Sequence, residues 1–223
     1  MGKKIFVTGT NTDVGKTFVT ALMVKKFCDA GFSAGYYKIA ASGKIFDGVA
    51  EDAFYVKKIS GLTCDMRNFV SYAFKNSVSP HLAAKIEKRQ INFSVIEKNF
   101  LNAADKFDFL TIEGSGGIIC PLRFDEKILM LDDVVKKLNL SAVVVVDSKL
   151  GEINSAVLTV EHLRAKKISV KGLIFNRFDE KNLLHADNKE VIEKLTNLKT
   201  IATVKNHADE INISAERLSS IYE

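Results

Sequence analysis

Short runs of apolar, β-branched residues alternate along the chain with longer segments in which apolar residues recur at helical spacing. The apolar runs predict strands over residues 5–8, 35–39, 109–112, 142–146, 170–175 and 200–204. The periodic segments predict helices up to about Ala30, over residues 52–59, 80–88, 94–106, 132–138, 154–166 and 189–195, and from Ser214 onward. Residues 142–146 are all apolar, as in a strand buried on both faces. The alternation predicts an α/β fold: an open, mostly parallel β-sheet flanked by helices on both faces.

Composition narrows the class of protein. The chain has 223 residues, of which 47% are hydrophobic and 26% charged, which excludes intrinsic disorder and collagen-like structure. No repeat, low-complexity tract or linker interrupts the pattern, so we expect a single domain over residues 1–223. The longest apolar run is far shorter than the roughly 20 residues that cross a bilayer, so we expect no membrane association.

The charge of the chain bears on its binding partners, and its cysteine content on its compartment. The net charge is +5, but lysines are interspersed with acidic residues and form no basic block, so we expect no nucleic-acid partner. Cys28, Cys64 and Cys120 are widely spaced and odd in number, which predicts neither a disulfide framework nor a zinc site. With no secretory signal at the N-terminus, a cytoplasmic location is expected.

The strongest chemical signal is the phosphate loop, residues 9–17, which reads Gly-Thr-Asn-Thr-Asp-Val-Gly-Lys-Thr between the first strand and the first helix. Phosphates need backbone N–H donors, a helix N-terminus, an ammonium and a hydroxyl that can bind Mg²⁺. Gly15, Lys16 and Thr17 supply these groups in the required order. Five residues separate the two glycines, one more than in the common P-loop. The motif predicts a P-loop NTPase-like fold that binds ATP and Mg²⁺.

Two further strand ends carry candidate chemistry. Within residues 109–117, an apolar strand ends at Glu113 and is followed by Gly-Ser-Gly-Gly. P-loop proteins usually place a magnesium ligand beside the nucleotide at the end of such a strand, so Glu113 is a candidate ligand. Lys38 closes the second strand and leads toward Ser42. Strand ends in such sheets face the ligand crevice, so we expect the Lys38 ammonium and the Ser42 hydroxyl to meet substrate. On the sequence alone, an ordinary surface lysine is the alternative for Lys38.

These motifs together resemble one known family, the dethiobiotin synthetases. The resemblance rests on residues 9–17, 37–38, 41–43, 79–81, 113–117, 149–151 and 153–154, and it runs in order to about Asn176. The longer phosphate-loop spacing also occurs in that family. The resemblance implies an ATP- and Mg²⁺-dependent cyclo-ligase that converts 7,8-diaminononanoate and CO₂ to dethiobiotin, ADP and phosphate. The intermediates would be a carbamate and a carbamic-phosphoric anhydride.

The resemblance also implies residue roles. Lys16 and Lys38 would be catalytic, and Mg²⁺ would be bound by Thr17, Asp52 and Glu113. Nucleotide contacts would also come from Asp13, Val14, Gly15, Phe18, Gly114, Ser115, Gly116, Asn176 and Arg177. Substrate contacts would come from Thr12, Ser42, Lys149, Gly151 and Asn154. The last three lie on a loop that, in a homodimer with its active site near the interface, reaches toward the partner's substrate.

The chain departs from the family pattern at several positions. Ile39 and Ala40 follow Lys38 where a proline is expected, and the segment 204–206 lacks an expected proline beside the adenine. Arg177 stands where an aspartate is common, and Asn188 where a tyrosine often meets the substrate carboxylate. Two other classes compete with the synthetase. A regulatory P-loop ATPase of the partitioning type typically has a second lysine early in the loop, where this chain has Thr10 and Asn11. An amide-forming enzyme of the cobyrinic acid class carries an additional glutaminase domain, for which we expect no room. His81, at a predicted helix start, is expected to be structural.

Overall fold

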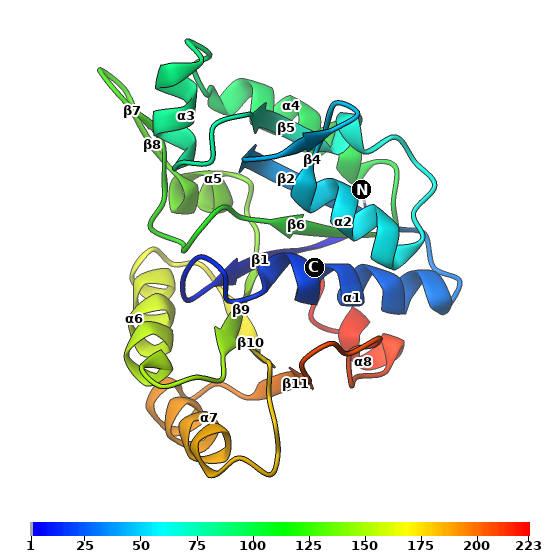
Figure 1. Cartoon of the computed structure of the whole chain (residues 1–223), viewed down its shortest axis with the longest axis vertical. Helices are drawn as coiled ribbons and strands as arrows, with labels where there is room; N and C mark the ends of the chain where they lie inside the picture. Colours follow the sequence, from blue (N-terminus) through cyan, green and yellow to red (C-terminus); the bar gives the residue numbers. More distant parts are fainter. Residues whose placement is uncertain (1) are drawn as a thin grey trace.

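The computed structural model describes residues 2–223; Met1, the first residue of the predicted single domain, lies outside the described residues. One seven-stranded sheet runs through the molecule in the order β11-β10-β9-β1-β6-β2-β5, and its paired strands are parallel (Figure 1). The strands are β1 (Lys3–Gly9), β2 (Ala34–Ser42), β5 (Val70–Phe74), β6 (Phe109–Glu113), β9 (Ala142–Asp147), β10 (Val170–Asn176) and β11 (Thr200–Val204). Two small antiparallel hairpins pair β3 (Ile45–Phe46) with β4 (Val49–Ala50), and β7 (Pro121–Phe124) with β8 (Ile128–Met130).

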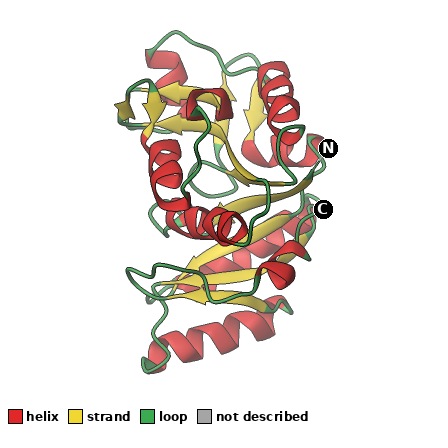
Figure 2. Ribbon diagram, turned by 90° about the vertical axis from the view of Figure 1, so that its right-hand side faces the viewer, coloured by secondary structure: helices red, strands yellow, loops and turns green. Residues whose placement is uncertain are grey.

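Helices lie on both sides of the strands (Figure 2). The chain first passes from β1 through β2 to β5 and then returns through β6, β9, β10 and β11, so right-handed crossovers place the two sets of helices on opposite faces. On the first face, α1 (Lys16–Asp29) packs against α2 (Glu51–Ser60) and α8 (Ala215–Ser219). The return path contributes α4 (Phe93–Ala104), α5 (Leu131–Lys137), α6 (Glu152–Ala165) and α7 (Leu183–Thr196). The short α3 (Pro80–Ile86) packs against β7, and a 3₁₀ turn, η1 (Met66–Phe69), leads into β5.

The predicted fold class is confirmed, and each predicted strand and helix is present. The prediction that Lys38 closes the second strand is wrong, because β2 continues to pair with β5 as far as Ser42 and Lys38 lies inside the strand. The sequence pattern missed β5 and the two hairpins, because these strands are short and Ser71 interrupts the apolar run of β5. Helix α7 begins at Leu183, well before the predicted residue 189, because the Asn182 side chain accepts a hydrogen bond from the Leu184 amide and caps the helix there. That the chain forms a single domain stays a prediction.

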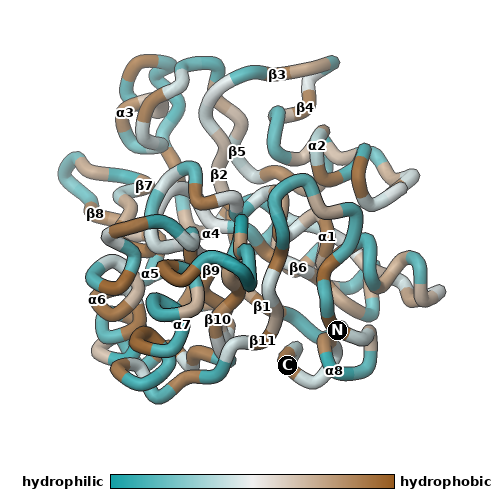
Figure 3. Tube along the Cα trace, turned by 60° about the horizontal axis from the view of Figure 1, so that its bottom comes forward, coloured by the Kyte–Doolittle hydropathy of each residue, from teal (hydrophilic) through white to brown (hydrophobic). Residues whose placement is uncertain are grey.

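The core lies along the central strands, whose buried residues are mostly apolar. Along the helices in Figure 3, hydrophobic segments alternate with hydrophilic ones. Residues 142–146 are each 0% exposed, which confirms the prediction of a strand buried on both faces. The C-terminal residue pairs with the first strand, since the Lys4 amide donates to the Glu223 carbonyl and the Glu223 amide to the Lys4 carbonyl. No helix within residues 2–223 is long and apolar enough to cross a membrane.

Candidate active site

A cleft of about 690 Å³ lies where β1, β2 and β6 end, at the edge of the sheet from which α1 departs. Most of the residues predicted for the site line this cleft: Thr12, Asp13, Gly15, Lys16, Thr17, Phe18, Lys38, Ser42, Asp52, Glu113, Ser115, Gly116 and Arg177. The lining also includes Ala40, Ala41, Glu51 and Tyr55, to which the sequence assigned no role in the site. Six predicted residues lie outside the lining: Val14, Gly114, Asn176, Lys149, Gly151 and Asn154.

The phosphate loop joins β1 to α1 in a conformation that needs glycine. Gly15 has φ 89°, and a Cβ there would come within 2.0 Å of Asn176 Nδ2. Lys16, the first residue of the helix, is 7% exposed and donates to the Asn11 carbonyl over 2.7 Å. Burial, together with repulsion from Lys38, lowers the pKa of Lys16 to about 8. An ammonium held in this way is ready to exchange a backbone carbonyl for a phosphate oxygen.

Lys38 lies between two carboxylates at the floor of the cleft. Its Nζ is 2.7 Å from Asp52 Oδ2 and 2.8 Å from Glu113 Oε1, and it also donates to the Gly114 carbonyl over 3.0 Å. Lys38 is 3% exposed and Glu113 is 0% exposed, so the alternative of a surface lysine is wrong. Burial opposes the charge on Lys38, but the attraction of Glu113 and Asp52 outweighs it and raises the pKa of the lysine. The attraction of Lys38 in turn lowers the pKa of Asp52.

Hydroxyl groups complete this cluster. Thr17 Oγ1 lies 2.8 Å from Glu113 Oε1 and 3.3 Å from Asp52 Oδ1. The Tyr36 hydroxyl donates to Glu113 Oε2 over 2.8 Å, so both carboxylate oxygens have a partner. Tyr36 belongs to no motif in the sequence, although its spacing of two from Lys38 places both side chains on one face of β2.

The donor atoms around Thr17 suit a magnesium ion. Mg²⁺ prefers oxygen ligands and is usually bound through one or two carboxylates plus substrate phosphates. The Thr17 hydroxyl and the carboxylates of Asp52 and Glu113 converge within hydrogen-bonding reach of one another. Within residues 2–223, no three His, Cys, Asp or Glu side chains gather as a metal cage. The residues therefore fit a metal whose coordination is completed by the nucleotide.

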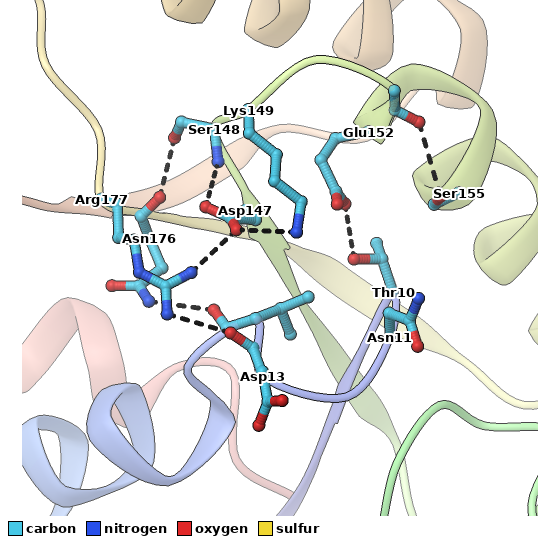
Figure 4. A network of polar contacts seen from close by, with 12 residues as sticks. Thr10, Asn11, Asp13, Asp147, Ser148, Lys149, Glu152, Ser155, Asn176 and Arg177 are labelled. Carbon is cyan, nitrogen blue, oxygen red and sulfur yellow. Dashed lines mark hydrogen bonds and ion pairs between the residues drawn. The ribbon is translucent and has the colours of Figure 1, made fainter.

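The opposite wall of the phosphate loop is fixed to the ends of β9 and β10 (Figure 4). Asn176 Nδ2 donates to the Val14 carbonyl over 2.9 Å. Arg177 donates through Nη2 to the Asp13 carbonyl over 2.9 Å and through Nη1 to Asp147 Oδ2 over 2.8 Å. Asn176 is 2% exposed and its Oδ1 is buried without a partner among the described residues. An acceptor of this kind suits a ligand that donates a hydrogen bond.

The substrate loop, residues 149–154, connects β9 to α6 and does not line the cleft of its own chain. The Lys149 side chain is 63% exposed, with Nζ 3.4 Å from Asp147 Oδ2. Gly151 has φ 93° and precedes the first turn of α6, where Asn154 is exposed. Asn188, 3% exposed, donates through Nδ2 to the Lys149 carbonyl over 3.1 Å. The loop is thus anchored, and none of its predicted substrate residues lines the cleft of the same chain.

Two side chains of reactive type, Cys120 and His81, lie outside this cleft. Cys120 is 7% exposed, and burial raises the pKa of its thiol to about 11, which fits a small buried hydrophobe. His81 lies outside the cleft, beside the exposed ring of Phe124.

Comparison with known proteins identifies the family. A family model described as an AAA domain matches residues 3–213. The chain is 45% identical over 212 residues to the ATP-dependent dethiobiotin synthetase BioD of Clostridium perfringens, which covers 94% of this chain and 93% of the relative. It is also 45% identical to the enzyme of the same name from Brachyspira hyodysenteriae, over 92% of each chain.

The chain belongs to the dethiobiotin synthetase family. The predicted membership is confirmed, and with it the enzyme class, an ATP-dependent ligase of biotin biosynthesis. A ParA family ATPase from Chlorobium tepidum superimposes with a TM-score of 0.59 at 12% identity, covering 99% of this chain and 90% of that one. At that identity, the likeness shows the fold alone.

Proposed function

We propose how this ATP-dependent cyclo-ligase uses its cleft. One amine of 7,8-diaminononanoate reacts with CO₂ to form a carbamate. Transfer of the γ-phosphoryl group of ATP converts the carbamate to a carbamic-phosphoric anhydride, and attack by the second amine closes the ureido ring and releases phosphate. Every intermediate is anionic, so the residues contribute mainly position and opposite charge.

The observation that carries this proposal is the pair of buried lysines at one end of the sheet. Lys16, on the phosphate loop, would contact the β- and γ-phosphates as its Asn11 contact is exchanged. Lys38, desolvated beside Glu113, would compensate the charge of the carbamate and then of the phosphoryl group in transit. A generic ATPase needs the first lysine but has no use for the second, which lies within β2.

Thr17, Asp52 and Glu113 would bind the Mg²⁺ ion, which when present neutralises phosphate charge. Further contacts to the nucleotide would come from Thr12, Asp13, Phe18, Gly114, Ser115 and Gly116. Asn176, just behind the lining of the cleft, would meet the base through its unpartnered Oδ1. Arg177, which lines the cleft, would lie beside the base. Ser42 and Thr12 would bind the diamine or carbamate end of the substrate.

We further propose a homodimer in which the substrate loop of one chain completes the site of the other. This is supported by the position of Lys149, Gly151 and Asn154, which do not line the cleft of their own chain. In such a dimer Asn188 would position the substrate loop through its hydrogen bond to the Lys149 carbonyl. A tyrosine that often meets the substrate carboxylate stands at this position in the family. A cytoplasmic location is supported by three free cysteines.

The deciding experiment follows dethiobiotin formation from the diamine, bicarbonate and Mg-ATP. We expect ATP turnover that depends on both the diamine and bicarbonate, with one ADP released per dethiobiotin. ATP hydrolysis that is indifferent to both compounds would favour a regulatory ATPase and overturn the proposal. Lys16→Ala is the matched inactive control.

A further inference from the structure

A buried carboxylate connects the phosphate loop to the substrate loop. Glu152, in the first turn of α6, is 4% exposed, and its Oε2 accepts a hydrogen bond from Thr10 Oγ1 over 2.6 Å (Figure 4). Thr10 is the second residue of the phosphate loop, and its amide donates to the Val145 carbonyl of β9 over 3.1 Å. Two segments that are 142 residues apart in the chain are therefore joined by one side-chain contact.

The contact is unusual for a position that only fills space. Burial of a carboxylate costs free energy unless hydrogen bonds or charges compensate it. Burial and the neighbouring Asp147 both disfavour the charge and raise the pKa of Glu152. The positive end of α6 offsets only part of this cost. For stability alone, an apolar side chain would fill the site at lower cost.

The two ends of the contact serve different ligands. Thr10 opens the loop that carries Lys16 and Thr17. Glu152 lies inside the substrate loop, between Gly151 and Asn154, and this loop is fixed on its other side by the Asn188 contact to the Lys149 carbonyl. A shift of Thr10 when phosphates bind would thus displace the start of α6, because the loop cannot absorb the motion freely.

We infer that Glu152 is a positioning residue through which nucleotide and diamine binding strengthen each other. The inference rests on the proposed function, which assigns the substrate loop to the diamine. Because such coupling is reciprocal, a bound nucleotide tightens diamine binding by the same factor as a bound diamine tightens nucleotide binding. In the proposed homodimer, the linkage runs from the nucleotide site of one chain to the diamine site of its partner.

Calorimetry on the full-length protein tests this. The dissociation constant of diaminononanoate is measured with Mg²⁺, in the presence and absence of a non-hydrolysable ATP analogue. We expect the analogue to tighten binding at least about fivefold in the wild type, at the lower end of typical coupling. Glu152→Ala and Thr10→Val should each lose most of that factor, and the double variant should lose no more than either one.

Conservative and control variants separate positioning from folding. Glu152→Gln should retain the coupling, because its amide oxygen still accepts the Thr10 hydrogen bond. Glu161→Gln, on the exposed part of α6, should leave it unchanged. If Glu152→Ala unfolds, Thr10→Val decides, since it removes only a half-buried hydroxyl.

Each outcome is decisive. Wild-type coupling in Thr10→Val or in Glu152→Ala would overturn the inference. A wild-type protein that binds both ligands without coupling between them would overturn it too. A wild type that binds the nucleotide but never the diamine would instead overturn the proposed function itself.

Discussion

At the level of single residues, the charge balance of the site centres on Lys38, a buried ammonium in contact with the carboxylates of Asp52 and Glu113. We expect Lys38→Met to reduce single-turnover dethiobiotin formation about a hundredfold, which corresponds to about 3 kcal/mol in the barrier. Because the substitution leaves Glu113 buried with one cationic partner fewer, it should also destabilise the protein by about 3 kcal/mol.

Thermal unfolding with and without Mg²⁺ checks the second effect. The metal should restore more stability to Lys38→Met than to the wild type, because it supplies the lost positive charge. Lys44→Met, at an exposed lysine just beyond the end of β2, is the control. Normal ring closure by Lys38→Met would make the lysine a bystander.

Glu113 gives the matching prediction for the metal. Glu113→Gln keeps the shape and the acceptor for Thr17 or Tyr36 but removes the charge that would attract Mg²⁺. We expect the Mg²⁺ concentration for half-maximal activity to rise about tenfold or more, with partial rescue by Mn²⁺, which accepts similar oxygen ligands. Glu51→Gln, an exposed carboxylate of the same cleft, should change it little. An unaltered metal requirement in Glu113→Gln would remove Glu113 from the metal site.

Between elements, one buried acid connects α5 to α6. Asp132 Oδ2 lies 2.7 Å from His162 Nε2 and 3.0 Å from Lys166 Nζ, and the Asp132 side chain is 2% exposed. Burial opposes its charge, but the hydrogen bonds from His162 and Lys166 outweigh burial and hold the pKa of the carboxyl below its ordinary value of 3.8. The folded state therefore binds this proton less readily than the unfolded chain, so the contribution of Asp132 is present above that value and is lost as the pH falls below it.

We expect Asp132→Asn to lower the free energy of unfolding by about 1–3 kcal/mol at pH 6, because it weakens two hydrogen bonds to a buried carboxylate. The difference from the wild type should shrink at pH 3, where the native carboxyl begins to protonate. Urea unfolding followed by circular dichroism at both pH values measures this. Asp187→Asn, an exposed acid on α7, serves as control. A difference that is constant with pH would contradict the ion-pair explanation.

For the whole molecule, the central prediction is that a complete site needs two chains. Lys38→Met and Asn154→Ala should each be nearly inactive alone. If Asn154 acts on the partner's substrate, each mixed dimer has one intact site and one doubly altered site. Random reassembly of equal amounts should then restore about a quarter of wild-type activity, since half of the dimers are mixed. Mixtures as inactive as their parents would place Asn154 in the site of its own chain.

The sequence by itself determined the order of the elements and the local chemistry. The helical and β-branched periods predicted the strands and helices, because burial of an apolar face requires those spacings. The phosphate loop was recognisable because Gly15, Lys16 and Thr17 act within one turn of one helix. Glu113 was recognisable as a strand end, and strand ends in a parallel sheet meet at one edge. Lys38 was expected at the same edge, although β2 continues beyond it to Ser42.

Only the tertiary structure decided which of these groups share a contact. Strand order brings β2 beside β6, so Lys38 reaches Glu113, 75 residues away in the chain, and that pairing has no local signal. The same is true of Tyr36 with Glu113 and of Thr10 with Glu152, whose spacings follow no helical or strand period. Burial also depends on the whole fold: Lys38 reads from the sequence as an ordinary surface lysine or a ligand-facing one, and only packing by β5, β6 and α2 makes it a desolvated charge.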